Sequence, residues 1–560
     1  MPDFTIKNPK YRSSKVTNGL TMAGPRAHLQ GMGLSREDMA KPFVAVINTH
    51  NEFHPGHVHL DKIADQVKAG ILEAGGIPFE VNTVSICDGF TQGHEGMCSV
   101  LPCREVATDS IEVYINANQF DGMVLIGGCD KTIPSILMAA LRVNIPAVIV
   151  TGGPMLPCFY KGNEYGTYQL KEMAGKLLKG DISESEYDYM EGIMSPGPGS
   201  CAMMGTANSM AICAEAMGLT LPGCASAHAV VGKKNRIARE SGKCVMRLIE
   251  ENIKPRDIVT QEMLDFATKV TLAVGGSTNI TLHLPAIAKE AHLEMSLERI
   301  GQFSYDTPYL AKIKPSGTYT LWDFDQAGGV QAVIKSISEI ENADLMTVNG
   351  KTHKENADSL VIWDRDVIRT VENANAPHGS IRVLKGNISP RGCVVKQSAV
   401  VPEMQKHTGP ARCFESEEET VKAIYEGKIQ HGDVIVIRNE GPKGGPGMRE
   451  MLTATSALVG MGYSTTTALI TDGRFSGATR GPCIGHISPE TAEGGTIAVI
   501  EDGDMIMIDI PGGKLELLVP EEEIARRKTL LKPFRPRVTE GYLYRYAMSV
   551  SSADEGAILK

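Results

Sequence analysis

The sequence predicts an α/β protein in which a parallel-sheet N-terminal domain, with helices on both faces, precedes a smaller, β-rich, β-barrel-like C-terminal domain. In the first two-thirds of the chain, short apolar runs alternate with longer segments of helical periodicity, which is typical of βαβ units. After about residue 380, short β-runs separated by glycines replace this pattern. The stretch 341–380 between them is polar, so we expect domains at 1–375 and 376–560.

The N-terminal part alternates expected strands with expected helices. The segment 57–76 has apolar residues at helical spacing and ends in Gly75-Gly76, a helix stop. The segment 120–153 reads as one βαβ unit, which implies parallel strands whose ligands lie beyond the carboxyl ends. We expect strands at 42–50, 78–86, 120–127 and 145–153, and helices at 57–76, 99–118 and 132–143.

The C-terminal part contains shorter β-runs. The last of them alternates methionine with isoleucine from Met505 to Ile508, then turns at Pro511-Gly512-Gly513 into a second alternating run. This pattern predicts a hairpin. The β-runs lie at 379–388, 392–399, 432–441, 467–473 and 496–520.

Composition excludes several classes of protein. The 560 residues are 42% hydrophobic and 22% charged, as in a globular protein of two to four domains. A net charge of −10 argues against a nucleic-acid-binding surface, because no basic excess exists to displace counterions. No apolar stretch approaches about 18 residues, and the N-terminus has no apolar signal region. We therefore expect a cytoplasmic protein without a membrane span.

Twelve cysteines are scattered singly, without a CxxC pair, which argues against a zinc ribbon or thioredoxin-type site. Most are expected to be reduced and buried. Cys129 in "IGGCDKTIPS" follows a strand, where a helix N-terminus should lower the pKa of its thiol. Cys201 lies on a Gly/Pro-rich loop, "SPGPGSC". Two such thiols fit an iron–sulfur or soft-metal site but do not define one.

Carboxylates occur in similar settings. Asp130 and Lys131 follow Cys129, Asp88 and Glu95 follow a strand, and Glu440 and Glu450 flank a glycine-rich stretch. Such oxygen ligands suit Mg²⁺. "GPKGG" is not a phosphate-binding loop, because no GKS or GKT follows it.

Each of these residues also has a purely structural explanation. Asp130 could cap a helix, Lys131 could be a solvated first-turn residue, and Ser476, in "LITDGRFSGATRG", could be a turn serine outside any GxSxG elbow. Only their combination points to chemistry.

Several long motifs occur together and in order. They are "GGCDKTIPSILMAALR", "GPGSCAMMGTANSM", "LTLPGCASAHA", "VGGSTNITLHLPAIAKEA", "EGPKGGPGMREML" and "LITDGRFSGATRGPCIGHISPETAEGG". With them the chain resembles the family of dihydroxy-acid dehydratase and 6-phosphogluconate dehydratase over nearly its whole length, and most of all its dihydroxy-acid dehydratase branch.

The resemblance implies a role for each motif residue. Domain 1–375 would carry the cluster cysteines and part of a magnesium site, and domain 376–560 would carry Glu450 and Ser476. Glu95 is a weaker candidate near the magnesium motif. The implied roles are iron–sulfur ligands for Cys129 and Cys201, Mg²⁺ ligands for Asp88, Asp130, Glu450 and a CO₂-carbamylated Lys131, and the base for Ser476.

One position departs from the family pattern. Gly56, in "HPGHVHL", stands where relatives with a [2Fe–2S] cluster have a third cysteine. The resemblance therefore favours [4Fe–4S], with [2Fe–2S] as the alternative, and leaves the third ligand open. Cys87 is the nearest candidate by motif and Cys98 a weaker one. For the neighbouring His54, His57 and His59 we expect helix-face or capping roles.

The implied activity is that of a hydro-lyase in branched-chain amino-acid biosynthesis. It would convert 2,3-dihydroxyisovalerate and 2,3-dihydroxy-3-methylvalerate to 2-keto acids without redox change. Ser476, as an alkoxide, would take the C2 proton of a Mg²⁺-chelated substrate, and an open iron would accept the 3-hydroxyl.

Two other functions stay open. One is a dehydratase of sugar acids such as gluconate. The other is a non-catalytic iron–sulfur sensor, which would be free to lose Ser476, Lys131 and Glu450. The expected partner is the small-molecule substrate, without nucleic acid or membrane, and the expected assembly is a homodimer or larger homo-oligomer.

Overall fold

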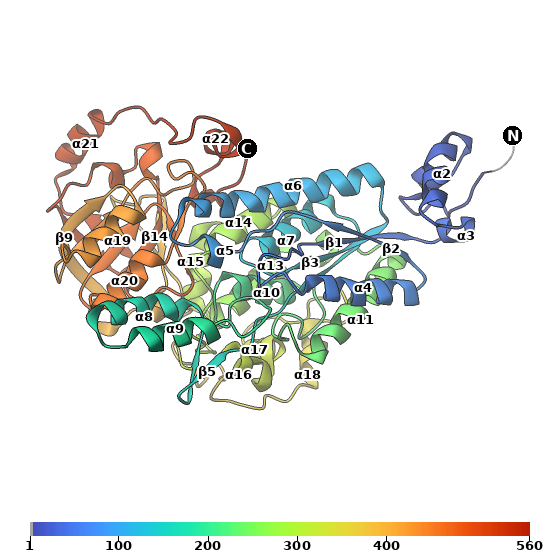
Figure 1. Cartoon of the computed structure of the whole chain (residues 1–560), viewed down its shortest axis with the longest axis horizontal. Helices are drawn as coiled ribbons and strands as arrows, with labels where there is room; N and C mark the ends of the chain where they lie inside the picture. The colour runs from blue at the N-terminus through green and yellow to red at the C-terminus, as the bar shows by residue number, and fades with distance from the viewer. Residues whose placement is uncertain (1–3) are drawn as a thin grey trace.

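Four parallel strands form the N-terminal sheet of the computed structural model, which describes residues 4–560 (Figure 1). Their order is β2-β1-β3-β4, and every neighbouring pair is parallel, as predicted. Strands β1, β3 and β4 are buried along their whole length, which explains their continuous apolar runs. The strands are β1 (Phe43–Asn48), β2 (Ile77–Asn82), β3 (Gly122–Gly127) and β4 (Ala147–Thr151).

Helices cover both faces of this sheet, as predicted. Helices α4 (Leu60–Glu73) and α11 (Gly232–Glu251) pack on one face, and α6 (Val100–Asn118) and α7 (Thr132–Val143) pack on the other (Figure 1). Further helices enlarge the domain: α8 (Tyr168–Lys179), α9 (Glu184–Ile193), α10 (Thr206–Ala216), α13 (Gln261–Ala273), α14 (Ile280–Ala291), α15 (Leu297–Asp306), α16 (Leu321–Ala327), α17 (Gly329–Ile337) and α18 (His353–Asp358).

The C-terminal sheet has eight strands in the order β16-β15-β9-β10-β12-β14-β8-β7. The pairs from β9 to β14 are parallel and the others antiparallel. The strands are β7 (Arg382–Leu384), β8 (Gly392–Val395), β9 (Lys406–Phe414), β10 (Val434–Ile437), β12 (Ala468–Thr471), β14 (Cys483–Ser488), β15 (Met505–Asp509) and β16 (Lys514–Leu517).

The two outer strands of this sheet nearly meet. Lys385, just after β7, donates its N–H to the carbonyl of Gly513 (2.9 Å) and accepts from the N–H of Leu515 (3.0 Å). The predicted barrel-like character is thereby confirmed. Val434 and Val436 of β10 face the barrel core, whereas Ile435 and Ile437 pack against α19 (Glu417–Tyr425) and α20 (Thr453–Met461).

Two elements of the C-terminal domain differ from the sequence-based prediction. The hairpin of β15 and β16 is confirmed, but 496–500, predicted as a β-run, is the 3₁₀ helix η6 (Thr496–Val499). Its apolar side chains fill the barrel core from a helical turn instead of a strand. Strand β9 was not predicted, because Gly409 and Pro410 interrupt its pattern.

The C-terminal segment ties the two sheets together. Helix α22 (Gly541–Ser549) lies near α6, and the buried Arg104 of α6 donates from Nη2 to the carbonyls of Gly556 (2.9 Å) and Ala557 (2.8 Å) (Figure 1). Tyr546 packs there among side chains of both domains. No helix within residues 4–560 is long and apolar enough to cross a membrane.

Close packing of α4 on α11 generates a stability prediction. A Cβ at Gly70 would lie 1.9 Å from the backbone oxygen of Arg239, so Gly70→Ala must push the helices apart. We expect the free energy of unfolding to fall by about 1–3 kcal/mol. Gly192→Ala in α9 is the control, because a Cβ there meets nothing within 4 Å. Urea unfolding followed by circular dichroism measures both; equal midpoints for Gly70→Ala and wild type would contradict the prediction.

Candidate active site

The predicted site residues meet in one cavity of about 340 Å³ between the two sheets. The N-terminal domain contributes residues that follow the carboxyl ends of β2 and β3, as expected for a parallel sheet. The C-terminal domain contributes residues on and after the short strands β11 (Glu450–Met451) and β13 (Arg474–Phe475). The predicted residues that line the cavity are Cys87, Asp88, Cys129, Asp130, Cys201, Glu450 and Ser476.

Three carboxylates surround Lys131. Asp88, Asp130 and Glu450 each offer an oxygen, and the three oxygens lie within 4.8 Å of one another. The Lys131 Nζ is 3.0 Å from Asp88 Oδ2, 3.8 Å from Glu450 Oε2 and 3.9 Å from Asp130 Oδ2. Lys131 is buried and does not occupy the solvated first turn that its structural explanation required.

Two further residues complete this group, and no sequence pattern indicated a site role for either of them. The buried Arg474 pairs through Nη1 with Glu450 Oε2, and its Nη2 is 3.6 Å from Asp88 Oδ2. Asn279 donates from Nδ2 to Glu450 Oε2 (2.9 Å). Asn279 lies in the motif "VGGSTN" and Arg474 in the motif "DGRFSG". An arginine next to a β-run is ordinarily exposed, so nothing in the sequence indicated that Arg474 would lie in a buried site. Its burial depends on partners that are distant in sequence.

The group carries excess negative charge. Burial, followed by the neighbouring Asp88, raises the pKa of Asp130 to about 7. Asp88 Oδ1 is buried without a hydrogen-bond partner in the described chain. Three carboxylates thus face two cations, and one carboxylate oxygen is unsatisfied, which fits a site for a hard cation.

Asp130 does not cap the helix that follows it. Its Oδ1 accepts from the N–H of Ala207 (3.1 Å), at the beginning of α10. The N-terminal residue before α7 is Lys131 instead. Asp130 therefore links the loop after β3 to the helix that follows Cys201.

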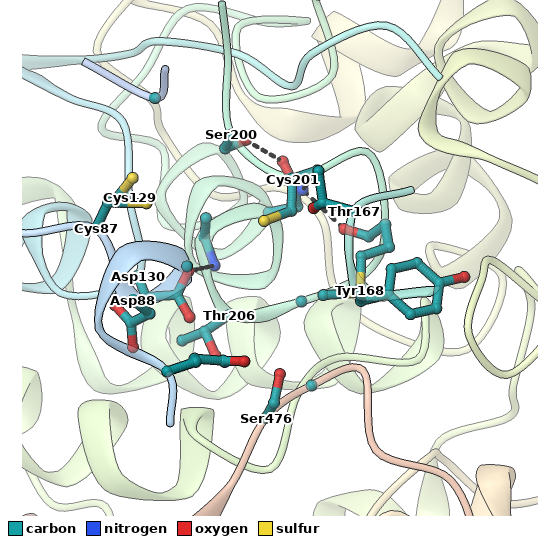
Figure 2. A pocket seen from close by; sticks show the side chains of 18 of the residues that line it. Cys87, Asp88, Cys129, Asp130, Thr167, Tyr168, Ser200, Cys201, Thr206 and Ser476 are labelled. Carbon is teal, nitrogen blue, oxygen red and sulfur yellow. Dashed lines mark hydrogen bonds between the residues drawn. The ribbon is translucent and has the colours of Figure 1, made fainter. Parts of the chain in front are cut away.

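Three thiols lie together in the cavity. Figure 2 shows Cys87 and Cys129 side by side, with the Cys201 sulfur directed into the same space from its own loop. No disulfide joins them. Three soft donors around one cavity fit an iron–sulfur cluster.

The expected low pKa of Cys129 is wrong for the protein without metal. A hydrogen bond with Cys87 and burial raise the pKa of the Cys129 thiol well above its usual range, and burial likewise raises that of Cys201. Binding of a metal would therefore release protons from the thiols.

The surrounding loops are held rigidly. A Cβ at Gly56 would lie 2.5 Å from Cys129 Sγ, so the thiol occupies the space of a side chain at position 56. Asn208 donates from Nδ2 to the carbonyls of Cys201 (2.6 Å) and Met203 (2.8 Å), which fixes the Cys201 loop.

Ser476 points into the cavity from the C-terminal domain (Figure 2). It follows β13, which pairs in parallel with β11 so that Arg474 lies beside Glu450. Its Oγ accepts from the N–H of Ala478 (3.3 Å). The side chain is 6% exposed, and the hydroxyl hydrogen is not engaged by any described acceptor.

Several candidates lie elsewhere. Glu95 is exposed at the beginning of η2 (Glu95–Ser99), and Cys98 faces the carbonyl of Gly445 at 3.9 Å; neither lines the cavity. Glu440 accepts from the N–H of Glu417 (3.2 Å), the first residue of α19, and does not line the cavity.

The three histidines near Gly56 are structural. His57 Nδ1 lies 2.8 Å from the carbonyl of Thr49, and His59 Nε2 lies 2.9 Å from that of Gly152. His54 stacks edge-on against Phe90. They flank the turn that brings Gly56 to Cys129. None of the three lies within a helix, and His59, at the N-cap position of α4, makes no capping hydrogen bond with its side chain, so the expected helix-face and capping roles are wrong.

Known proteins are similar to this chain over nearly its whole length. Residues 41–356 match the family described as dihydroxy-acid/6-phosphogluconate dehydratase N-terminal, and residues 366–557 match its C-terminal counterpart. "Dihydroxy-acid dehydratase 1" of Methanosarcina acetivorans is 51% identical over 552 residues, which cover 98% of this chain and 100% of the relative. Dihydroxy-acid dehydratases of Methanococcoides burtonii and Acetivibrio thermocellus are 52% and 48% identical, with the same coverage. The chain belongs to the dihydroxy-acid/6-phosphogluconate dehydratase family.

Proposed function

We propose that the protein is a hydro-lyase that dehydrates 2,3-dihydroxyisovalerate and 2,3-dihydroxy-3-methylvalerate to 2-keto acids in branched-chain amino-acid biosynthesis. The observation that carries the proposal is a single cavity that joins a hard-oxygen group, three thiols and the hydroxyl of Ser476. The names of the relatives support it. Cytoplasmic location and a homodimeric or larger assembly stay predictions of the sequence.

Asp88, Asp130, Glu450 and a carbamylated Lys131 would hold Mg²⁺. In carbamylation the neutral Lys131 amine attacks CO₂, an N–C bond forms and one proton leaves. Without this change, three carboxylates face the cations Lys131 and Arg474; with it, four anions face Arg474 alone. The larger negative excess suits a divalent cation.

Cys129, Cys201 and Cys87 would hold the iron–sulfur cluster. Cys87 would be the third ligand, because it lines the cavity and lies near enough to Cys129 to raise the pKa of that thiol. Three protein thiolates leave one iron of a [4Fe–4S] cluster without a protein ligand, so this cluster is preferred over [2Fe–2S]. Gly56 has no side chain that could bind an iron of the cluster.

The chain's own residues would move the proton. When bound, Mg²⁺ and the cluster would supply Lewis acidity for the substrate oxygens. Ser476 Oγ, as an alkoxide, would take the C2 proton, and the N–H of Ala478 would support the negative charge on Oγ. The C2–H electrons would form the C2=C3 bond as the C3–O bond breaks. The hydroxyl would leave as water by taking up the proton that Ser476 Oγ removed from C2, which restores the alkoxide. The enol then tautomerises to the 2-keto acid.

The wall of the cavity favours an alkyl substrate over a sugar acid. Met203 and Leu452 pack together with Ala478, and Tyr168 borders them. Met203, Leu452 and Tyr168 all line the cavity. This apolar wall suits the methyl and ethyl groups on C3 of a branched dihydroxy acid and offers few partners to the hydroxyls of gluconate.

Ser476→Ala tests the base. We expect kcat to fall by about 10²–10⁴-fold, the usual loss for a general base, with little change in substrate affinity. Exchange of solvent deuterium into C2 of the substrate should stop. Iron, sulfide and Mg²⁺ contents serve as controls for an intact site. A variant with intact metals and most of its turnover would show that the base lies elsewhere.

Serine substitutions test the cluster ligands. Cys87→Ser, Cys129→Ser and Cys201→Ser should each lose cluster absorbance and activity, because each removes a soft ligand. Cys98→Ser and Cys413→Ser are matched controls outside the cavity and should keep the cluster. Iron and sulfide are measured per chain after anaerobic purification. Full iron content in Cys87→Ser would reject Cys87 as the third ligand.

Leu452→Ser tests the apolar wall. Loss of apolar contacts should lower kcat/KM for 2,3-dihydroxyisovalerate by about 10–200-fold, the range for small changes in a hydrophobic pocket. Because gluconate would not use these contacts, its kcat/KM should not fall in parallel. Steady-state kinetics with both substrates measure this difference. An equal fold-loss of kcat/KM for 2,3-dihydroxyisovalerate and for gluconate would argue against Leu452 as a specificity residue.

A further inference from the structure

Lys396 is a buried cation that the proposed mechanism does not use. It follows β8, its side chain is 7% exposed, and its Nζ donates to the carbonyl of Gly477 (3.2 Å). No carboxylate of residues 4–560 lies within 4.0 Å of this nitrogen. A buried charge without a counter-ion lowers stability, so its presence here calls for another explanation.

Gly477 belongs to the turn that presents the proposed base. It lies between Ser476 and Ala478, and the N–H of Ala478 donates to Ser476 Oγ (3.3 Å). Lys396 and Ser476 also line one small cavity behind this turn. The lysine thus lines a second cavity, which shares Ser476 with the substrate cavity.

The other titratable groups of this small cavity are Cys483 and His486, both on β14. Burial raises the pKa of Cys483 to about 12, and burial together with Arg474 and Lys131 lowers that of His486 to about 3. Both are therefore neutral between about pH 5 and 9. Burial lowers the pKa of Lys396 to about 7, so among the described groups that line this small cavity Lys396 alone changes charge near neutrality.

We propose that Lys396 is a positioning residue for Ser476: its ammonium group holds the 476–478 turn through the Gly477 carbonyl and supplies the positive potential that stabilises the Ser476 alkoxide. The inference rests on the proposed role of Ser476 as base. When the alkoxide forms, the Ser476 hydroxyl proton goes to solvent water. The alkoxide in turn favours the charged lysine, because the two groups titrate together.

A thiol at position 476 measures this potential without relying on turnover. The full-length holoenzymes Ser476→Cys and Ser476→Cys/Lys396→Met are alkylated with iodoacetamide across a pH series, and peptide mass spectrometry reports the rate at position 476. We expect the apparent thiol pKa to be at least about one unit lower when Lys396 is present. Lys7→Met, which removes another buried lysine remote from the cavity, should leave it unchanged. Equal values with and without Lys396 would overturn the inference.

Lys396→Met alone supplies the kinetic readout. At pH 7 we expect kcat to fall at least about tenfold with little change in KM, and to recover partly as rising pH deprotonates Ser476. Lys396→Gln, which keeps a donor for Gly477 but no charge, should behave like Lys396→Met. A loss of kcat that is uniform with pH would overturn the inference. So would wild-type kcat in Lys396→Gln.

Stability separates this role from a structural one. The lysine pKa is lower in the folded than in the unfolded chain, so Lys396→Met should unfold at a higher temperature than wild type. The gain should be full below about pH 7 and fade as the pH approaches 10.5. A lower melting temperature with lost iron would mark Lys396 as structural and overturn the inference. Retained activity in Ser476→Ala would instead overturn the base assignment, whatever the thiol shows.

Discussion

Two buried basic side chains at the junction of the sheets, Lys131 in its uncarbamylated form and Arg474, link the two domains and border the carboxylates of the cavity. Lys131 Nζ comes from the N-terminal domain and lies 3.8 Å from Glu450 Oε2 of the C-terminal domain. Arg474 makes the reverse connection, from the C-terminal domain to Asp88. Removing one member of such a buried group leaves a partner uncompensated, at a cost of about 3–5 kcal/mol. Domain docking and the electrostatics of the site therefore depend on the same side chains.

Unfavourable features gather around this junction. Asp130 has a raised pKa, the Cys129 and Cys201 thiols are held neutral by the hydrogen bond with Cys87 and by burial, and within residues 4–560 one oxygen of Asp88 lacks a hydrogen-bond partner and Lys396 has no counter-ion. Such exceptions to good packing and pairing are expected at functional sites. Bound cations would compensate the charge of Asp130 and Asp88 and favour the thiolate forms of Cys129 and Cys201. A negative charge on Ser476 would compensate Lys396. The rigid surroundings, including the Arg104 clamp on the C-terminal segment, keep these features in place.

Most of the fold could be predicted where local pattern and burial agree. Strand β3 reads clearly because both its faces are buried, and the βαβ order fixes its neighbours as parallel. Strand β9 and the 3₁₀ helix η6 could not be predicted, because their conformations depend on strand pairing and on core space that distant segments supply. The motif residues of the site could be named through the family resemblance. The sequence could not identify three other buried residues, because only tertiary contacts reveal that they lie beside Glu450 or Ser476. They are Arg474, Asn279 and Lys396.

The central claim is that this cavity dehydrates branched dihydroxy acids rather than sugar acids. Its most direct test is turnover by the anaerobically purified, cluster-loaded and Mg²⁺-loaded wild-type protein, with formation of 2-keto acid followed for 2,3-dihydroxyisovalerate and for gluconate. We predict a kcat/KM for 2,3-dihydroxyisovalerate at least about tenfold above that for gluconate, since the apolar wall discriminates by contacts of that size. Preference for gluconate, or no turnover of either substrate by fully loaded protein, would contradict it.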